Sequence, residues 1–135
     1  MRYTLLIANA PDAWDRPADA TAADGVIDDW DAYTRALHAA GVLVTGAGLN
    51  GTHTATAVRL RGGQRLLTDG PFADTKEHLV GLYVIDVPDL DAALAWAARV
   101  PNVRTGTVEV RPISPATLAH EQVGLRLAAA PAAHA

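Results

Sequence analysis

Residues 69–77, with the sequence DGPFADTKE, bring together the side chains of this chain that are best suited to chemistry. A desolvated Asp69 or Glu77 has the chemistry of a general base that acts on a carbon acid. Lys76, the only lysine in the sequence, would stabilise an oxyanion or hold a carboxylate beside that base. Asp69 is the first choice for the base, because the turn that follows it fixes the direction of its short side chain.

The same segment also has a structural interpretation. Asp-Gly-Pro is typical of a turn, Phe72 would plug the core, and the polar residues that follow would face solvent. A third interpretation lies between these two, because an aromatic side chain among ionisable groups is typical of a site that binds a ligand without catalysis. The residues alone leave a catalytic base, a ligand site and a structural loop as open alternatives.

Two histidines are the closest to this segment. His53 and His78 would each exchange protons near neutral pH, although a histidine in a loop or at the start of a strand also serves packing or lies at the surface. They do not form an i, i+4 pair, and no carboxylate-rich ligand spacing surrounds them, so no metal site is expected. The glycines at 46–51 and 61–63 lack the GxGxxG context, so no nucleotide cofactor is expected either.

A second set of candidates lies on the predicted strands and on the first predicted helix. If the open face of the sheet lines a cavity, Arg59 and Arg111 would bind an anionic substrate and Tyr83 would donate a hydrogen bond to it. The alternative is a cross-strand ion pair between Glu109 and an arginine at a dimer seam. Trp30 is expected in the core or in the wall of a pocket.

Composition limits the classes of function. With 135 residues, 50% hydrophobic and 19% charged, the chain fits a single globular domain. The net charge of -4 argues against a nucleic acid or an anionic membrane as partner, because either would favour a basic surface. The chain has no cysteine, and its first apolar run is too short for a signal sequence or a membrane span. A cytoplasmic protein is therefore expected.

The hydrophobic pattern predicts two helices between short strands. Asp24 would cap the first helix, Gly41 would end it, and the glycine pair at 62–63 indicates a tight hairpin. We expect this order: a strand at 3–8, a helix at 24–40, a strand at 42–45 that ends at the glycines of 46–51, a hairpin of 54–60 and 65–70, a strand at 80–87, a helix after Pro88-Asp89 with Leu90, Ala93, Leu94 and Ala97 on one face, and a strand at 107–112.

This order predicts an α+β fold in which two helices cover one face of an antiparallel sheet. On the last strand, Val108 and Val110 should point to one side, and Glu109 and Arg111 to the other. The second face of the sheet is therefore expected to be semi-polar, which suits a lined cavity or a wet dimer interface.

Several segments together resemble the DGPF group of the YCII-related proteins: TDGPFADTKE at 68–77, the apolar strand with Gly81 and Tyr83, DLDAAL at 89–94 and VEVRP at 108–112. The resemblance covers a domain at 1–113. It implies a ferredoxin-like antiparallel sheet with two helices on one face, plus a β-hairpin, that pairs across a homodimer into a dimeric α/β barrel with a pocket beside the sheet. Residues 114–135 are expected to form a C-terminal extension that is partly helical and then frays.

The wider superfamily implied by this resemblance contains small-molecule enzymes, among them muconolactone-type isomerases. Better-known YCII proteins carry a proposed catalytic dyad, with a histidine on the first helix and an Asp-Pro near the end of the second. In this sequence these positions fall on Trp30 and on Val100-Pro101. The chemistry of the dyad is therefore not transferred to this chain.

The sequence thus predicts a homodimer that binds a small anionic or aromatic organic molecule in a pocket next to the 69–77 loop, without cofactor or metal. In one hypothesis Asp69 is the base for proton transfer, isomerisation or elimination, with Lys76 and Glu77 beside it. In a second the pocket serves a non-catalytic ligand-binding or regulatory module, and in a third the loop belongs to the dimer interface. The expected ligand-binding residues are Phe72, Tyr83, His53, His78, Arg59, Arg111 and Trp30.

Overall fold

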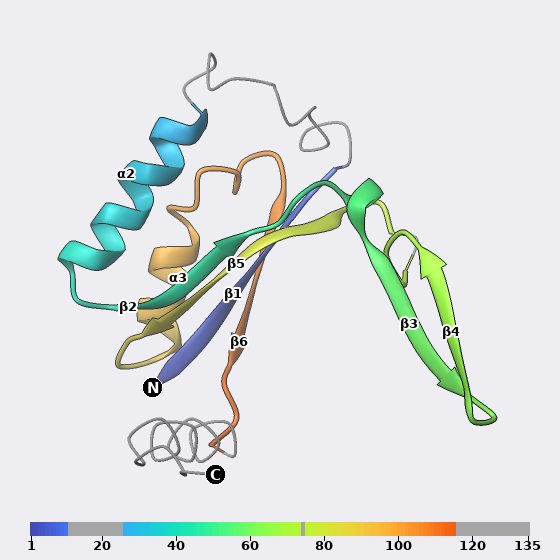
Figure 1. Ribbon diagram of the computed structural model, residues 1–135. Coiled ribbons are helices and arrows are strands. Elements are labelled where there is room, and N and C mark those ends of the chain that lie inside the picture. The colour runs from blue at the N-terminus through green and yellow to red at the C-terminus, as the bar shows by residue number, and fades with distance from the viewer. Residues whose placement is uncertain (11–25, 74, 116–135) are drawn as a thin grey trace, which may run out of the picture.

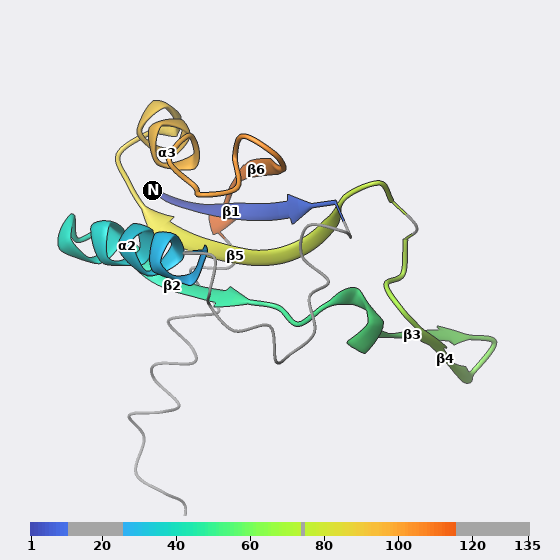
Figure 2. The same cartoon turned by 90° about the horizontal axis from the view of Figure 1, so that it is seen from above.

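The computed structural model describes residues 1–10, 26–73 and 75–115. They form a four-stranded antiparallel sheet with two helices on one face, and a separate two-stranded hairpin (Figure 1, Figure 2). The elements are β1 (Arg2–Asn9), α2 (Val26–Ala39), β2 (Leu43–Gly48), the 3-10 turn η1 (Thr52–Thr54), β3 (Thr56–Arg61), β4 (Gln64–Asp69), β5 (His78–Asp86), α3 (Leu90–Ala97) and β6 (Thr107–Pro112). The predicted α+β fold is confirmed, while the predicted helix in the C-terminal extension lies outside the described residues.

The strand order in the main sheet is β2-β5-β1-β6, and every neighbouring pair is antiparallel. Helix α2 connects β1 to β2 and helix α3 connects β5 to β6, which is the βαββαβ order of a ferredoxin-like domain. The β3–β4 hairpin is inserted between β2 and β5. In the described part of the single chain the sheet is open and does not close into a barrel.

The core lies between the sheet and the two helices. Along β1 the side chains alternate between the two faces, so that Tyr3, Leu5 and Ile7 are buried beneath the helices. The other buried apolar residues of the core are Tyr33, Leu37, Val80, Ile85, Val87, Ala93, Ala97 and Val100. No helix in the described segments is long and apolar enough to cross a membrane.

Gly41 ends helix α2, as the sequence predicted. It has a φ of 71°, its N–H donates to the His38 carbonyl at 3.0 Å, and the Val42 N–H donates to the Leu37 carbonyl at 3.1 Å. These two bonds form a Schellman motif, which needs a left-handed residue, and glycine adopts that conformation without strain. The predicted cap at the other end, Asp24, lies outside the described residues.

Helix α3 buries only part of its apolar face. Ala93 and Ala97 are buried, whereas Leu90 and Leu94 are 48% and 47% exposed. The helical period sets the two leucines to one side of the stripe that runs through the alanines, and Trp96 packs on the other side of that stripe. The four residues lie on one side of the helix, as predicted, but only the two alanines are buried.

Replacing Asp89 by alanine should lower the free energy of unfolding by about 1 kcal/mol. Asp89 Oδ1 accepts a hydrogen bond from the Ala92 N–H at 2.9 Å and so caps the N-terminus of α3. Without the Asp89 carboxylate, the Ala92 N–H loses its hydrogen-bond acceptor at the positive end of the helix dipole. Urea denaturation measures the loss. Asp89→Ser keeps an acceptor and should recover most of it, and an unchanged midpoint for Asp89→Ala would contradict the assignment.

Strands β3 and β4 form the predicted hairpin. Gly62 and Gly63 have φ values of 55° and 76°, and a type I′ turn requires positive φ at both central positions. The strands pair from Thr56 opposite Asp69 to Arg61 opposite Gln64. Among the described residues the hairpin pairs with no strand of the main sheet, and it projects on the side of the sheet away from the helices (Figure 1).

The sheet face opposite the helices is semi-polar, as predicted. Val108 and Val110 pack against the core, while Glu109 and Arg111 are exposed on the other side of β6. The register of the strands places three half-buried apolar residues at the centre of this open face: Leu6, Leu82 and Val84. The open face therefore has an apolar centre with charged groups along β6.

Candidate functional site

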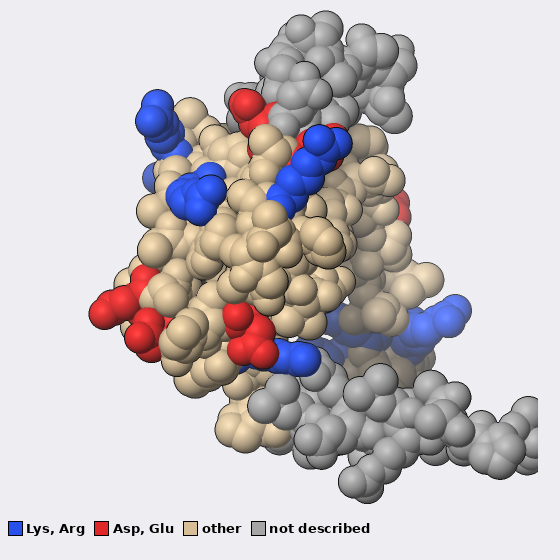
Figure 3. Space-filling model, turned by 90° about the vertical axis from the view of Figure 1, so that its left-hand side faces the viewer, with Lys and Arg blue, Asp and Glu red and all other residues tan. Residues whose placement is uncertain are grey.

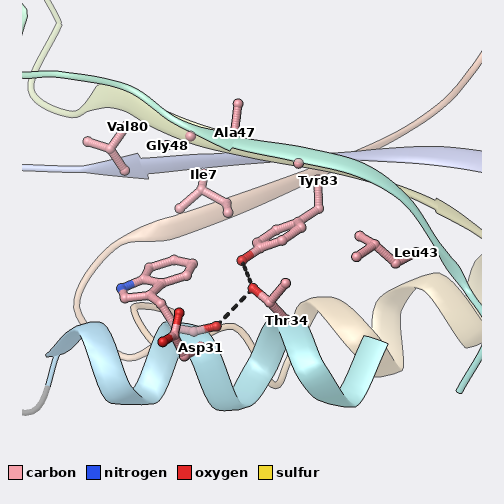
Figure 4. Close-up of a pocket in the computed structure, with 11 residues that line it drawn as sticks. Ile7, Asp31, Thr34, Leu43, Ala47, Gly48, Val80 and Tyr83 are labelled. Atoms are coloured by element: carbon pink, nitrogen blue, oxygen red, sulfur yellow. Dashed lines mark hydrogen bonds between the residues drawn. The ribbon is translucent and has the colours of Figure 1, made fainter. Parts of the chain in front are cut away.

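A cavity lies between α2 and the β2–β5 edge of the sheet (Figure 4). We call it the helix–sheet cavity. Its volume is about 480 Å³, which is within the range of roughly 300–1,000 Å³ that small-molecule pockets span. The lining residues are Ile7, Trp30, Asp31, Thr34, Leu43, Gly46, Ala47, Gly48, Val80, Gly81 and Tyr83. A mainly apolar wall with a few polar groups is typical of a site for a small organic molecule.

Gly46 and Gly48 of β2 have no side chains and so leave space for this cavity. A methyl group on Gly46 would lie 2.6 Å from Tyr83 Cδ1, so the tyrosine ring lies directly against the backbone of β2. A methyl group on Gly48 would meet no atom within 4 Å, and because Gly48 lines the cavity, that methyl group would occupy cavity space. The predicted break of this strand at residue 46 is wrong, because Gly46 and Gly48 pair with Tyr83 and Gly81 of β5.

Tyr83 and Thr34 form the polar part of the cavity wall. Thr34 Oγ1 lies 2.9 Å from the Trp30 carbonyl oxygen and 2.6 Å from Tyr83 Oη (Figure 4). A carbonyl oxygen only accepts and a hydroxyl has a single proton, so Thr34 donates to Trp30 and Tyr83 donates to Thr34. With its proton committed to Thr34, the Tyr83 oxygen offers lone pairs to a ligand. The cavity therefore presents a hydrogen-bond acceptor at this point.

Aromatic rings hold Tyr83 in place. The Trp30 and Tyr83 ring centroids lie 6.5 Å apart at an interplanar angle of 16°, and the Tyr33 ring meets Tyr83 edge-on at 5.4 Å. Tyr33 is fixed in turn, because its hydroxyl donates to the Trp96 carbonyl at 2.9 Å. Burial raises the pKa of the Tyr33 phenol far above its ordinary value, with Tyr83 adding to the shift and Arg99 opposing it. Tyr33 is therefore a neutral, fixed support for the cavity wall.

The charges around the helix–sheet cavity favour ligands that donate hydrogen bonds. Among the described residues that line it, the one charged side chain is the exposed carboxylate of Asp31. An anionic ligand would find no lysine or arginine among these described lining residues. On the helix side of the molecule, acidic and basic groups are interspersed around an uncharged area (Figure 3). Tyr83 and Asp31 thus both offer acceptor oxygens, which complement N–H and O–H groups.

Trp30 and Tyr83, two of the predicted ligand-binding residues, line the helix–sheet cavity together. They come from different elements, α2 and β5, which the fold brings into contact. Asp31 and Thr34 were not predicted. Thr34 follows Trp30 by four positions and so lies on the same face of the helix. A polar residue within the predicted apolar stripe was the signal that would have found it.

Lys76 and Glu77 line a different cavity, on the open face of the sheet. Its volume is about 580 Å³, and Leu6, Thr107 and Glu109 contribute to its wall. Leu6 points to the opposite face from Ile7, so this cavity and the helix–sheet cavity lie on opposite faces of the sheet.

Glu109 forms an ion pair with an arginine of its own strand. Arg111 Nε lies 2.8 Å from Glu109 Oε2, and both side chains are largely exposed on β6. The pair forms along the strand because residues two positions apart point to the same face. The cross-strand pair at a dimer seam stays a prediction, because it involves a second copy of the chain.

A third cavity, of about 510 Å³, lies next to the 69–77 loop, and Phe72 and His78 line it. Phe72 is 81% exposed, so the expectation that it plugs the core is wrong for the single chain. The chain reaches Phe72 from the projecting hairpin and not from the main sheet. Arg59 Nη2 donates to the Phe72 carbonyl at 3.4 Å, and His78 Nδ1 is buried without a hydrogen-bond partner among the described residues. His53, on η1, is exposed and lines none of these three cavities.

Asp69 lies apart from the other predicted catalytic residues. It is exposed at the end of β4, opposite Thr56, and it lines none of the three cavities. The described residues thus place Asp69 on the hairpin, Lys76 and Glu77 on the open face, and Trp30 with Tyr83 on the helix face. No group of three or more His, Asp or Glu side chains within those residues is arranged to hold a metal ion.

Comparisons with known proteins identify the family of the chain. Residues 1–117, which include every residue that the structure describes, match the model of the YCII-related domain. The chain is 38% identical over 119 residues to uncharacterized protein R00369 of Rhizobium meliloti (strain 1021), and the match covers 84% of this chain and 93% of that protein. The chain therefore belongs to the YCII-related family.

Proposed function

We propose that the helix–sheet cavity binds a small aromatic molecule that carries a hydrogen-bond donor. The observation that carries this proposal is the hydrogen-bond chain from Tyr83 through Thr34 to the Trp30 carbonyl, because it leaves Tyr83 Oη as an acceptor. The neighbouring rings of Trp30 and Tyr83 provide an apolar wall on which an aromatic ligand packs.

An aromatic ligand fits this lining better than an anionic one. A ligand amine or hydroxyl would pair with Tyr83 or Asp31. A ligand carboxylate would lose its hydration and gain no cation from the described lining residues. Of the two ligand classes that the sequence indicates, the lining therefore favours the aromatic class.

Binding without catalysis is the function that the geometry supports best. The hydrogen-bond chain from Tyr83 ends at a backbone carbonyl, which does not pass a proton on. Asp69, the base of the catalytic hypothesis, lies on the hairpin and outside the cavity. Among the described residues of the lining, a catalytic role for the cavity would have to rest on Asp31, their one carboxylate.

We also propose that two copies form a homodimer of the dimeric α/β barrel type, as the resemblance to the DGPF group implies. The open face supports this, because Leu6, Leu82 and Val84 form an apolar centre that a second sheet would cover. Charged groups of β6 at the edge of this face suit the rim of such an interface.

The binding proposal is tested with three small probes and one blocking substitution. Isothermal titration calorimetry with indole, benzylamine and benzoate should show binding of the two donor-bearing probes and weaker binding of benzoate. Gly48→Leu adds a side chain where the cavity is open, and it should weaken indole binding at least about tenfold, or about 1.4 kcal/mol. Gly48 does not have a positive φ, so the leucine meets no backbone strain there.

Thr45→Leu is the matched control. Thr45 lies on the same strand, is exposed and does not line the helix–sheet cavity. Its affinity for indole should stay within about twofold of the wild type, or about 0.4 kcal/mol. Equal binding by Gly48→Leu and wild type, or tightest binding of benzoate, would contradict the proposal.

A further inference from the structure

The β3–β4 hairpin exposes an apolar face that no described residue covers. Val58, Leu60 and Leu67 on this face are 63%, 67% and 59% exposed. Val58 lies opposite Leu67 and Leu60 lies opposite Arg65, so these side chains point to the same side of the hairpin. A two-stranded hairpin is marginal on its own in water, and burial of this face would stabilise it.

The charges on this face are placed symmetrically about its apolar centre. On β4, Arg65 comes two residues before Leu67 and Asp69 comes two residues after it. Strand alternation puts all three side chains on one face, with Arg65 and Asp69 about 14 Å apart at 3.4 Å per residue. From the tip of the hairpin to its base, this strip is basic, then apolar, then acidic.

We infer that this face of the hairpin binds the same face of the hairpin of a second copy of the chain. A two-fold axis in the plane of contact, perpendicular to the strands, places the two hairpins face to face and antiparallel. Leu67 then meets Leu67 of the partner subunit, and Arg65 meets Asp69 of the partner subunit. The symmetry produces this ion pair twice and buries the apolar residues between the pairs.

The charge pattern favours a second copy over an unrelated partner. A strip that is basic at one end and acidic at the other is complementary to itself when it is turned by 180°. This contact goes beyond the proposed sheet-to-sheet dimer and does not depend on it, because it uses the hairpin alone. It also gives Asp69 a role at an interface, where it pairs with an arginine, in place of a role as a base.

Sedimentation velocity of the full chain over a concentration series tests this contact. Arg65→Glu turns both attractive pairs into repulsive ones and should raise the dissociation constant about tenfold. Asp69→Arg should have the same effect. The double variant Arg65→Asp/Asp69→Arg restores both pairs with reversed polarity, and its dissociation constant should return to within about threefold of the wild type.

Arg61→Glu is the matched control, because Arg61 lies near the tip of the hairpin but on its opposite face. It changes the net charge as Arg65→Glu does, and it should alter the dissociation constant by less than about twofold. Leu82→Asp, on the open face of the sheet, reports separately on the sheet-to-sheet dimer.

Four results would overturn the inference. The first is a wild-type chain that stays monomeric throughout the series, and the second is equal association of Arg65→Glu and Arg61→Glu. The third is a double variant as weak as the single variants, since the two charges would then contact something other than each other. The fourth is dissociation by Leu82→Asp with no effect of Arg65→Glu, which would place the whole contact on the sheet.

Discussion

Replacing Leu37 by alanine is expected to lower the free energy of unfolding by about 2–5 kcal/mol. Leu37 is fully buried on the inner side of α2 and belongs to the core between the helices and the sheet. The substitution removes apolar atoms from the core and leaves a cavity that the neighbouring side chains fill only in part. Because a small domain is stable by only about 5–15 kcal/mol, this is a large share of the total.

Urea denaturation, followed by circular dichroism, measures this loss, and an unchanged m-value shows that the unfolding transition is the same. Leu94→Ala is the control, since it makes the same chemical change on α3 at a side chain that is 47% exposed. Leu94→Ala should lower the free energy of unfolding by less than about 1 kcal/mol. Equal losses at Leu37 and Leu94 would show that the core is not where the structure places it.

A Gly46→Val variant is expected to have a free energy of unfolding about 2–4 kcal/mol below that of the wild type. The substitution should also change the shape of the helix–sheet cavity. The new Cβ would lie 2.6 Å from Tyr83 Cδ1 and 2.9 Å from Tyr83 Cε1, closer than any normal contact. The tyrosine ring therefore has to move, and it would then lose its hydrogen bond to Thr34 and its packing against Tyr33. The near-ultraviolet circular dichroism spectrum reports on the fixed packing of aromatic side chains. This spectrum should change, and the free energy of unfolding should fall.

Gly48→Ala is the control for this position. It places a methyl group on the same strand and toward the same side, where the structure has no atom within 4 Å. Its stability should stay within about 0.5 kcal/mol of the wild type. If Gly46→Val kept the aromatic signal of the wild type, the close approach of Tyr83 to β2 would be incorrect.

Local patterns in the sequence predicted the elements well. The glycine pair at 62–63 predicted the hairpin, and Gly41 predicted the end of α2, because a positive φ is a property of one residue and its neighbours. The alternation on β6 predicted that Val108 and Val110 lie on one side of the strand and Glu109 and Arg111 on the other, because the period of a strand depends on the backbone alone. Such features need no knowledge of distant parts of the chain.

The location of the candidate site was not predictable in this way. The ionisable groups of 69–77 are close together in the sequence, and that proximity suggested a single site. The structure separates them, because β4 ends on a hairpin that projects from the sheet, whereas Lys76 and Glu77 have already returned to the open face. Strand β2 continues through its glycines for a related reason, since its partner β5 supplies a ladder that local propensity does not include.

The sequence by itself determined the fold class, the order of the elements, the turn at 62–63 and the membership in the YCII-related family. Tertiary structure decided which side chains share a space. Trp30 and Tyr83 meet because the helix packs across the sheet at the β2–β5 edge, and Gly46 lets the tyrosine ring lie against the neighbouring strand. Local conformation depends on neighbours in the chain, whereas a cavity depends on distances between elements that only packing sets.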